Sequence, residues 1–264
     1  MMNPETAINI SHVSKVFNNG VVALKDVNLK VDREDFVSLV GPSGCGKSTI
    51  LRIIAGLSES SEGKIEWADR SLKEQIAFVF QEPALMPWST VRNNIRLPLK
   101  LMGISKRMAD ASIAKTLELV GLENFANAYP RQLSGGMKMR VSIARAIVTE
   151  PRVLLMDEPF GALDDITRTN LNDELLSLWN HQRQTILFVT HNIYEAVYLS
   201  KRVVVMAANP GRAIAEIPID EPLPRTEAFR TSERYLNYCQ QVYAALSEAM
   251  DPQSHESPRQ FFQV

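Results

Sequence analysis

The sequence predicts an α/β fold, in which helices cover both faces of a parallel sheet and a helical insertion occupies the middle of the chain. Short, mostly apolar runs separated by helical segments are typical of such a sheet. These runs lie at residues 36–40, 76–80, 153–156 and 186–189. Between residues 83 and 150, apolar residues instead favour helices, and few strand signals appear. The 264 residues, of which 45% are hydrophobic, suffice to bury a substantial core.

The N-terminal part of the chain, residues 8–40, predicts β structure. Apolar residues alternate there with polar neighbours at Val27, Leu29 and Val31. Asn19-Gly20 is a hairpin-turn signal between two such runs. The apolar run at 36–40 then enters a glycine-rich loop. Residues 48–56 after the loop have helical character, with Gly56 as the predicted cap.

After the last apolar run, the sequence predicts a hairpin and then a helix. Residues 202–206 and 214–219 flank Asn209-Pro210-Gly211, whose Pro-Gly pair predicts a type II turn. Residues 229–250 have a helical pattern. Apolar residues that lie roughly on one face of this helix are Leu236, Tyr243, Leu246 and Met250. The polar, proline-containing stretch 251–264 is predicted to be disordered.

The net charge limits the classes of partner that are expected, and the cysteine content limits the expected compartment. The net charge of −1, from 29 basic and 30 acidic residues, gives no electrostatic footprint for nucleic acid or an anionic membrane. Cys45 and Cys239 suggest neither a disulfide framework nor a metal site, so a reducing compartment is expected. The N-terminus shows no secretory signal. No apolar run approaches the ~20 residues that span a bilayer, so any membrane connection is expected to run through a partner.

A glycine-rich loop follows the run at 36–40. It fits the P-loop pattern G-x-x-x-x-G-K-[ST], and its residues are Gly41, Pro42, Ser43, Gly44, Cys45, Gly46, Lys47, Ser48 and Thr49. The glycines let backbone N–H groups converge on phosphate oxygens, and the helix that follows adds the positive end of its dipole. We expect Lys47 to place a cation on the β and γ phosphates of ATP, and the Ser48 hydroxyl to bind Mg²⁺. Cys45 is interpreted as a small filler, not as a nucleophile.

Two adjacent acids, Asp157 and Glu158, end the apolar run at 153–156. Acids at the carboxyl end of a buried strand are costly unless a cation neutralises them, and this end is where ligands bind in open α/β sheets. Mg²⁺ with ATP would supply that neutralisation. We therefore expect Asp157 to hold the Mg²⁺ shell and Glu158 to act as general base toward the attacking water.

A second glycine-rich helix start occurs at residues 133–137, Leu-Ser-Gly-Gly-Met. Ser134 is a good N-cap, and Gly135 and Gly136 open backbone N–H groups toward an anion. Because the P-loop already cradles one γ-phosphate, this second anion site makes more sense if it serves another nucleotide. The sequence therefore predicts a dimer in which each site is completed by the neighbouring copy.

The order of these motifs resembles that of ABC ATPases. The P-loop is followed by Gln81, the Leu-Ser-Gly-Gly motif, Leu-Leu-Met-Asp-Glu-Pro and Thr190-His191, and the resemblance runs from about residue 13 to residue 206. It implies a P-loop NTPase (RecA-like) core with an N-terminal antiparallel β subdomain and an inserted α-helical subdomain. On this basis the chain divides into an ABC ATPase domain at 1–206, with the insertion at about 83–150, a C-terminal hairpin and helix at 207–250, and the tail.

The resemblance also implies roles for single residues. Residues 133–137 match the signature motif that contacts the partner's γ-phosphate, and Ala162-Leu163-Asp164 resembles the loop that links the two sites. Gln81 resembles the glutamine that reaches Mg²⁺ or the attacking water and senses the membrane partner. His191 matches the switch histidine that contacts the γ-phosphate, and Phe17 the aromatic that stacks on adenine. Met137 and Asn192 depart from the common glutamine and acid, but neither change removes a catalytic group.

A single ATPase unit without a membrane segment resembles bacterial importers, in which permease and ATPase are separate chains. Met86-Pro87-Trp88, Met137 and residues 209–212 resemble the nitrate, sulfonate and taurine importer branch. The implied partners are transmembrane permease subunits, a second ATPase copy and a separate solute-binding protein, at the cytoplasmic face of the membrane and without nucleic acid. The alternatives are a non-transport ABC ATPase, one serving lipid movement or cell division, and a P-loop kinase, which leaves the signature motif unexplained. An exposed Trp88 would favour docking to a membrane subunit over simple packing.

Overall fold

The computed structural model describes residues 5–161, 163–222 and 225–250. The tail at 251–264, predicted to be disordered, and Ala162 lie outside the described residues. Within the described ranges, none of the helices is both long and apolar enough to cross a membrane.

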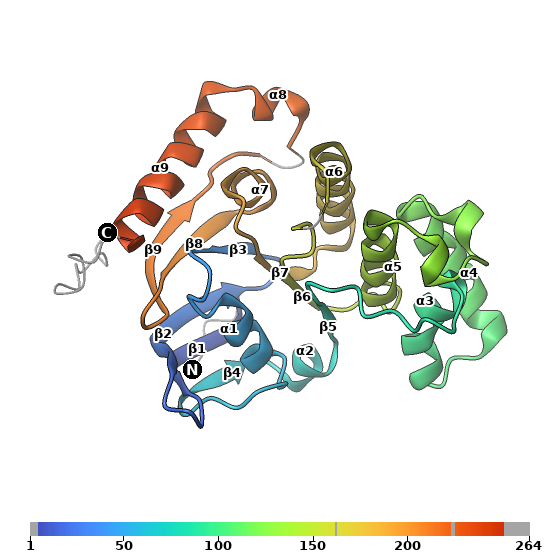
Figure 1. Cartoon of the computed structure of the whole chain (residues 1–264), viewed down its shortest axis with the longest axis horizontal. Coiled ribbons are helices and arrows are strands. Elements are labelled where there is room, and N and C mark those ends of the chain that lie inside the picture. Colours follow the sequence, from blue (N-terminus) through green and yellow to red (C-terminus); the bar gives the residue numbers. More distant parts are fainter. Residues whose placement is uncertain (1–4, 162, 223–224, 251–264) are drawn as a thin grey trace.

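A six-stranded sheet runs through the centre of the molecule (Figure 1). Its strands, in spatial order, are β5 (Ile76–Val79), β6 (Val153–Asp157), β7 (Thr185–Val189), β3 (Phe36–Val40), β8 (Arg202–Ala207) and β9 (Arg212–Pro218). Neighbouring strands are parallel except β8 and β9, which form an antiparallel hairpin. Every residue of β3, β6 and β7 is buried, as expected for strands covered on both faces. The predicted α/β class and C-terminal hairpin are confirmed.

The connection between β8 and β9 is not the predicted type II turn. Such a turn needs a positive φ at its third residue, which would be Gly211. The left-handed residue is instead Asn209, with φ 57°, and the Asn209–Pro210 peptide is cis. Glycine is needed at position 211 for close packing and not for a positive φ. A Cβ there would lie 2.2 Å from the carbonyl oxygen of Cys45 and 2.6 Å from that of Ala23. The turn therefore packs directly on the backbone of the phosphate loop.

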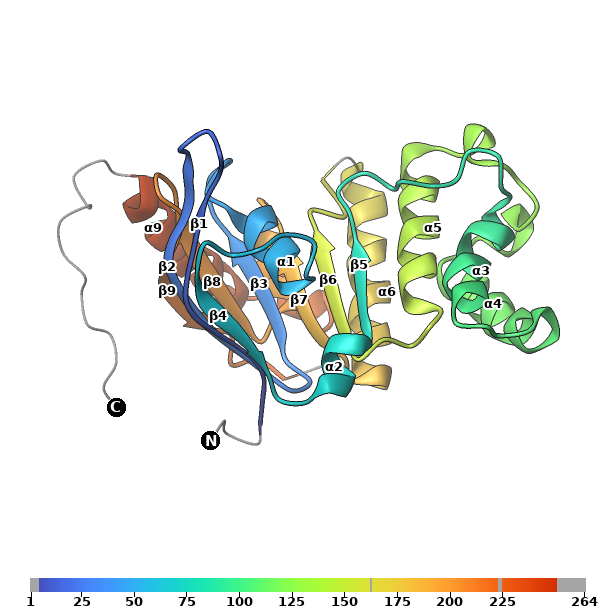
Figure 2. The ribbon, with the colours of Figure 1, turned by 90° about the horizontal axis from the view of Figure 1, so that it is seen from below.

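A three-stranded antiparallel sheet covers one side of the central sheet (Figure 2). Its order is β2 (Val22–Asp32), β1 (Thr6–Val16) and β4 (Glu62–Trp67). The predicted hairpin at Asn19-Gly20 is confirmed, and Gly20 has φ 81°. β4 was not predicted, because its polar sequence gives no local strand signal and it forms by pairing with β1. The short helix α2 (Arg70–Glu74) follows it.

Helix α1 (Lys47–Ile54) lies between the two sheets (Figure 2). Its apolar residues share one buried cluster with side chains of both sheets, and they are Ile50, Leu51, Ile53 and Ile54. The helix ends in a Schellman motif, in which Gly56 N donates to Ile53 O and Leu57 N donates to Arg52 O. The predicted Gly56 cap is therefore confirmed, and it fixes the C-terminal end of the helix that follows the phosphate loop.

Three helices form an arm beyond the β5 edge of the central sheet (Figures 1 and 2). This helical arm consists of α3 (Val91–Leu101), α4 (Lys106–Leu119) and α5 (Gly135–Ile147), with short 3₁₀ helices at Glu123–Phe125 and Pro130–Gln132. Helix α5 has two buried faces. Val141 and Ala144 belong to the cluster of the arm, whereas Met139 and Ile143 belong to the main core. The arm is thus joined to the core through α5.

The remaining helices cover the opposite side of the central sheet (Figure 1). They are α6 (Asp165–Gln182), α7 (Ile193–Leu199), α8 (Glu227–Arg230) and α9 (Glu233–Met250). The buried residues of α9 include Tyr235, Cys239 and Val242. Of the four apolar residues grouped in the sequence, Leu246 packs partly buried against the main core, whereas Leu236, Tyr243 and Met250 are 50%, 65% and 67% exposed.

Candidate active site

The carboxyl ends of three neighbouring parallel strands carry the predicted catalytic loops. β6, β7 and β3 are adjacent, and they lead into Glu158, the Thr190-His191 pair and the phosphate loop respectively. The register pairs Asp157 with Val189, so the ends of β6 and β7 are level. Residues far apart in the sequence therefore meet at one edge of the sheet, where ligands bind in folds of this class.

The phosphate loop turns through two glycines with positive φ, Gly44 at 79° and Gly46 at 91°. Lys47 is only 5% exposed, and its Nζ donates to the carbonyl oxygens of Gly41 (2.8 Å) and Pro42 (3.0 Å). Cys45 is fully buried, and burial raises the pKa of its thiol. A protonated, inaccessible thiol agrees with a filler and not with a nucleophile.

Ser48 and Asp157 form the next part of the site. The Ser48 hydroxyl donates to Oδ1 of Asp157 at 2.7 Å, which joins the start of α1 to the end of β6. Asp157 is 2% exposed, and burial raises the pKa of its carboxyl despite the Ser48 bond. A buried carboxylate beside a hydroxyl offers the hard oxygen ligands that Mg²⁺ prefers.

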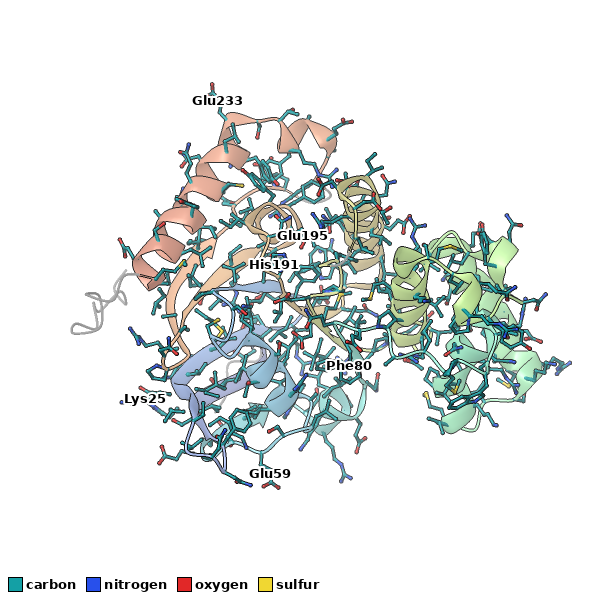
Figure 3. The ribbon with its side chains drawn as sticks, in the orientation of Figure 1. Lys25, Glu59, Phe80, His191, Glu195 and Glu233 are labelled. Atoms are coloured by element: carbon teal, nitrogen blue, oxygen red, sulfur yellow. The ribbon has the colours of Figure 1, made fainter. Side chains whose placement is uncertain are left out.

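Glu158 and His191 face each other across the strand ends. Oε2 of Glu158 lies 3.1 Å from Nδ1 of His191. Glu158 adopts a left-handed backbone with φ 47°, an uncommon conformation for a residue with a Cβ, and its N–H donates to Val189 O. The side chain of His191 is 59% exposed and that of Glu158 is 20% exposed. Figure 3 marks His191 at the start of the segment that leads into α7.

Two further predicted residues, Gln81 and Phe17, lie at the periphery of this site. Gln81 is exposed and follows β5, which is paired in parallel with β6, so it lies at the same edge as Asp157. Arg145 of α5 donates to the carbonyl oxygens of Pro83 and Ala84 and ties the segment after Gln81 to the arm. Phe17, on the β1–β2 hairpin, is 42% exposed.

The signature segment lies elsewhere, at the start of α5. Ser134 caps this helix by accepting a hydrogen bond from Met137 N at 3.2 Å, and Ser134 and Gly135 are both exposed. Figures 1 and 2 place α5 beyond the β5 edge, whereas α1 lies over the sheet. The two anion-binding helix starts of one chain thus belong to different parts of the molecule.

Asp164 lies at the start of α6, between two residues that pack against the signature segment. It is the N-cap of α6 and accepts a hydrogen bond from Thr167 N at 2.9 Å, which lowers the pKa of its carboxyl. A Cβ on Gly136 would be 3.4 Å from side-chain atoms of both Leu163 and Thr167. The start of α5 therefore packs against the start of α6.

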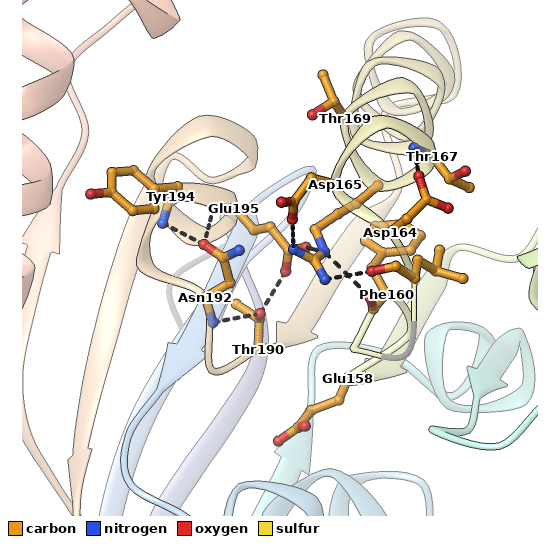
Figure 4. Close-up of polar contacts among 12 residues, drawn as sticks. Glu158, Phe160, Asp164, Asp165, Thr167, Thr169, Thr190, Asn192, Tyr194 and Glu195 are labelled. Carbon is orange, nitrogen blue, oxygen red and sulfur yellow. Dashed lines mark hydrogen bonds and ion pairs between the residues drawn. The ribbon is translucent and has the colours of Figure 1, made fainter.

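A polar network that the sequence did not predict adjoins this site. It joins Thr190 and Glu195 to Arg168 of α6 (Figure 4). One signal was present in the sequence, because Glu195 is an acid within the otherwise uncharged segment 193–199. What the sequence could not supply was its partner, since only the fold brings α6 and α7 together.

Comparison with known proteins agrees with this arrangement. Residues 24–161 match the family described as ABC transporter. An uncharacterized ABC transporter ATP-binding protein of Methanocaldococcus jannaschii is 45% identical over 91% of this chain and 91% of its own length. The aliphatic sulfonates import ATP-binding protein SsuB of Bacillus cereus is 45% identical over 83% of this chain and 89% of its own length.

A solved structure extends the likeness to three dimensions. The dimeric, post-hydrolysis state of the ATP-binding cassette MJ0796, bound to ADP and Pi, superposes with a TM-score of 0.74 at 33% identity, over 81% of this chain and 100% of that one. The chain has the sequence motifs, the fold and the relatives of one family. It belongs to the ABC transporter family, as an ATP-binding and ATP-hydrolysing cassette.

Proposed function

We propose that this ATPase energises a membrane importer for a small solute, and that it works as two copies which close around two ATP molecules with Mg²⁺. The observation that carries the proposal is the meeting of Lys47, the Ser48–Asp157 pair and the Glu158–His191 pair at one sheet edge. The exposed signature segment on the arm supports the pairing of copies. The proposed solutes are nitrate, a sulfonate, taurine or a related organic compound, and the relatives named as aliphatic sulfonates import proteins favour a sulfonate among them.

The donor set suits Mg²⁺. Among the residues that the structure describes, no three His, Cys, Asp or Glu side chains gather as a metal site. Mg²⁺ in nucleotide sites needs only one or two protein oxygens, because phosphates and waters complete its shell. Ser48 and Asp157 would hold the ion, with Gln81 reaching it from the end of β5. When bound, Mg²⁺ neutralises charge on the β and γ phosphates.

The remaining steps belong to side chains of this chain. The ammonium of Lys47, which now donates to two carbonyl oxygens, is placed to donate to phosphate oxygens instead. Glu158 can accept a hydrogen bond from the attacking water and orient it for in-line attack. The charged form of His191 can donate to a γ-phosphate oxygen while Glu158 fixes the ring. Phosphoryl transfer needs mainly such positioning and charge stabilisation.

Docking to a permease has support on the arm side of the molecule. Trp88 is 76% exposed, the condition under which the sequence favours a partner over packing. Exposed large apolar residues also occur at the end of α3, where Leu101 and Met102 are 79% and 63% exposed. Apolar surface of this kind is typical of protein interfaces. We therefore propose that permease subunits hold the protein at the cytoplasmic face of the membrane, in a complex that includes a solute-binding protein.

The Glu158→Gln variant tests the catalytic part of the proposal. The amide keeps the size of the side chain but is a far weaker base, so we expect ATP binding to persist and turnover to fall by about 10²-fold or more. Glu118→Gln, at an exposed position of α4, is the matched control and should hydrolyse ATP normally. Turnover of Glu158→Gln close to that of the unmodified protein would remove Glu158 from its assigned role.

The transport part is tested by recovering the partners. Tagged Glu158→Gln protein, with ATP and Mg²⁺, would be isolated from membranes and its bound chains identified. A polytopic permease is the expected partner, and its companion binding protein could then be screened against sulfonates, taurine and nitrate. Soluble or ribosomal partners alone would instead favour the alternative of a non-transport ABC ATPase, and a lipid or cell-division complex would favour the other alternative.

A further inference from the structure

A buried ion pair connects the loop that carries His191 to the loop that leads from Glu158 to α6. Glu195 of α7 is 4% exposed, and its Oε2 accepts a hydrogen bond of 2.6 Å from the Thr190 hydroxyl. Its other oxygen, Oε1, lies 3.2 Å from Nε of Arg168. Figure 4 shows this chain of contacts running from Thr190 through Glu195 to α6.

On the α6 side, the guanidinium of Arg168 holds both ends of the loop between Glu158 and Asp164. Its Nη2 donates to Leu163 O at 2.7 Å, and its Nε lies 3.4 Å from Phe160 O. The same loop lies close beside the catalytic pair, since a Cβ added to Gly161 would be 3.5 Å from Cε1 of His191 and 3.8 Å from Oε2 of Glu158. The position of this loop therefore bears directly on both side chains.

On the α7 side, the residues before and after His191 both have hydrogen-bonded side chains. Thr190 Oγ1 donates to Glu195 and accepts a hydrogen bond from Asn192 N at 3.0 Å. The Asn192 side chain caps α7 by accepting from the N–H groups of Tyr194 (2.9 Å) and Glu195 (3.3 Å). His191, which faces Glu158, therefore lies in a loop that is held by hydrogen bonds on both sides.

Stability alone does not explain the Glu195–Arg168 ion pair. Burying two charges costs free energy that their attraction only partly returns, and apolar side chains of similar volume often serve as well. Oε1 of Glu195 is buried and accepts no hydrogen bond within the described part of the chain, so the carboxylate is incompletely satisfied. Burial raises the pKa of Glu195 accordingly. The location of the pair, between two catalytic loops, offers a reason for keeping it.

We infer that Glu195 and Arg168 are positioning residues, which hold His191 in register with Glu158 through Thr190 on one side and the carbonyls of Phe160 and Leu163 on the other. The inference rests on the proposed function, because it assigns the pair to the same hydrolytic site. Neither residue is expected to touch ATP. Their loss should slow the chemical step and leave nucleotide binding almost unchanged.

The test uses the whole protein and two independent ways of breaking the network. Glu195→Gln removes the charge facing Arg168 at constant size, and Thr190→Val removes the hydroxyl at constant shape. For each we expect kcat to fall by roughly tenfold to a hundredfold, the range that small displacements of catalytic groups produce, with KM for ATP within about twofold. Thr190→Ser restores the hydroxyl and should restore kcat.

Asp165→Asn is the matched control. It removes the other carboxylate that contacts Arg168, at 2.7 Å, but that side chain is 94% exposed and lies outside the chain of contacts to Thr190. Its kcat should stay within about twofold of the unmodified protein, because exposed pairs contribute little. The double variant Thr190→Val with Glu195→Gln should be no slower than the worse single variant, since both interrupt one unit.

Expressing kcat per folded active site distinguishes a positioning role of these residues from a general loss of structure in the variants. The inference is overturned if Glu195→Gln and Thr190→Val turn over normally per folded site, or if Thr190→Ser fails to restore the rate lost in Thr190→Val. If Glu195→Gln fails to fold, the comparison of Thr190→Val with Thr190→Ser still tests the inference. Failure of the proposed function gives a different result, namely hydrolysis by Glu158→Gln.

Discussion

Asp157 is a buried acid at a position where the stability of the fold alone would favour an uncharged residue. It is 2% exposed, and burial raises the pKa of its carboxyl above the usual 3.8. An acid whose pKa is raised by folding favours the folded state when protonated and loses that contribution as pH rises through the folded pKa. At neutral pH the ionised Asp157 therefore destabilises the protein when no cation is bound, and its presence points to ligand binding.

Asp157→Asn should accordingly make the protein more stable and inactive. Without nucleotide and Mg²⁺ at pH 7, we expect the free energy of unfolding to rise by about 0.5–2 kcal/mol, a common gain when a functional site is neutralised. The gain should shrink as pH is lowered through the raised pKa of the native carboxyl, because the protonated acid no longer carries a buried charge. Urea unfolding at several pH values measures it, with the exposed Asp220→Asn as control. A variant that is less stable than the native protein at pH 7 would contradict the argument.

Single residues were predictable where chemistry and local sequence coincide. Asp157 and Glu158 follow an apolar run directly, and Ser48 stands at a fixed place in a phosphate-loop pattern, so their neighbours in the chain were enough to predict them as site residues. Arg168 and Glu195 gave no comparable pattern. They are 27 residues apart, and their contact exists only because α6 and α7 pack side by side.

Two glycines at element boundaries serve opposite purposes. Gly211 is the residue just before β9, and a Cβ there would collide with backbone oxygens of Cys45 and Ala23. Gly135 opens α5, where a Cβ would meet no atom within 4 Å and φ is not positive. The first glycine is required by packing. The second is open to replacement as far as the fold of one chain is concerned.

The paired variants Gly211→Ala and Gly135→Ala should separate stability from activity. Gly211→Ala should lower the free energy of unfolding by about 1–3 kcal/mol, as overpacking against rigid atoms does. Gly135→Ala should leave it unchanged or raise it by about 0.5 kcal/mol, because alanine favours helix. Its ATPase rate should nevertheless fall, since the new methyl group faces the partner's nucleotide in the proposed dimer. Full activity of Gly135→Ala would argue against that contact.

Helices and strands were predictable from the sequence where residues close together in the chain determine them. The buried strands β3, β6 and β7 showed as apolar runs, and the α1 cap showed as Gly56. β4 did not show, because pairing with β1 and not its own composition makes it a strand. The turn before β9 and the buried face of α9 are likewise set by what the rest of the chain places against them.

At the scale of the whole molecule, one chain holds the two halves of the proposed nucleotide site in places that do not meet. The phosphate loop lies between the carboxyl end of β3 and the start of α1, and the signature segment lies at the start of α5, beyond the β5 edge (Figure 2). Ser134 and Gly135 are exposed, so a second copy can reach them. The sequence predicted this need for a partner from a count of phosphate sites, but it could not give the spatial separation.

This separation makes a quantitative prediction for assembly. Glu158→Gln with ATP and Mg²⁺ should run in light scattering at twice the chain mass of 29.6 kDa, because bound ATP bridges the phosphate loop of one copy and the signature of the other. Adding Lys47→Ala should abolish both ATP binding and the dimer. Adding Gly135→Asp should abolish the dimer while ATP binding persists, since a carboxylate then faces the partner's γ-phosphate across the interface. If Gly135→Asp still dimerises with ATP, Gly135 does not face the partner's γ-phosphate and the proposed contact between the signature segment and the partner's nucleotide is wrong.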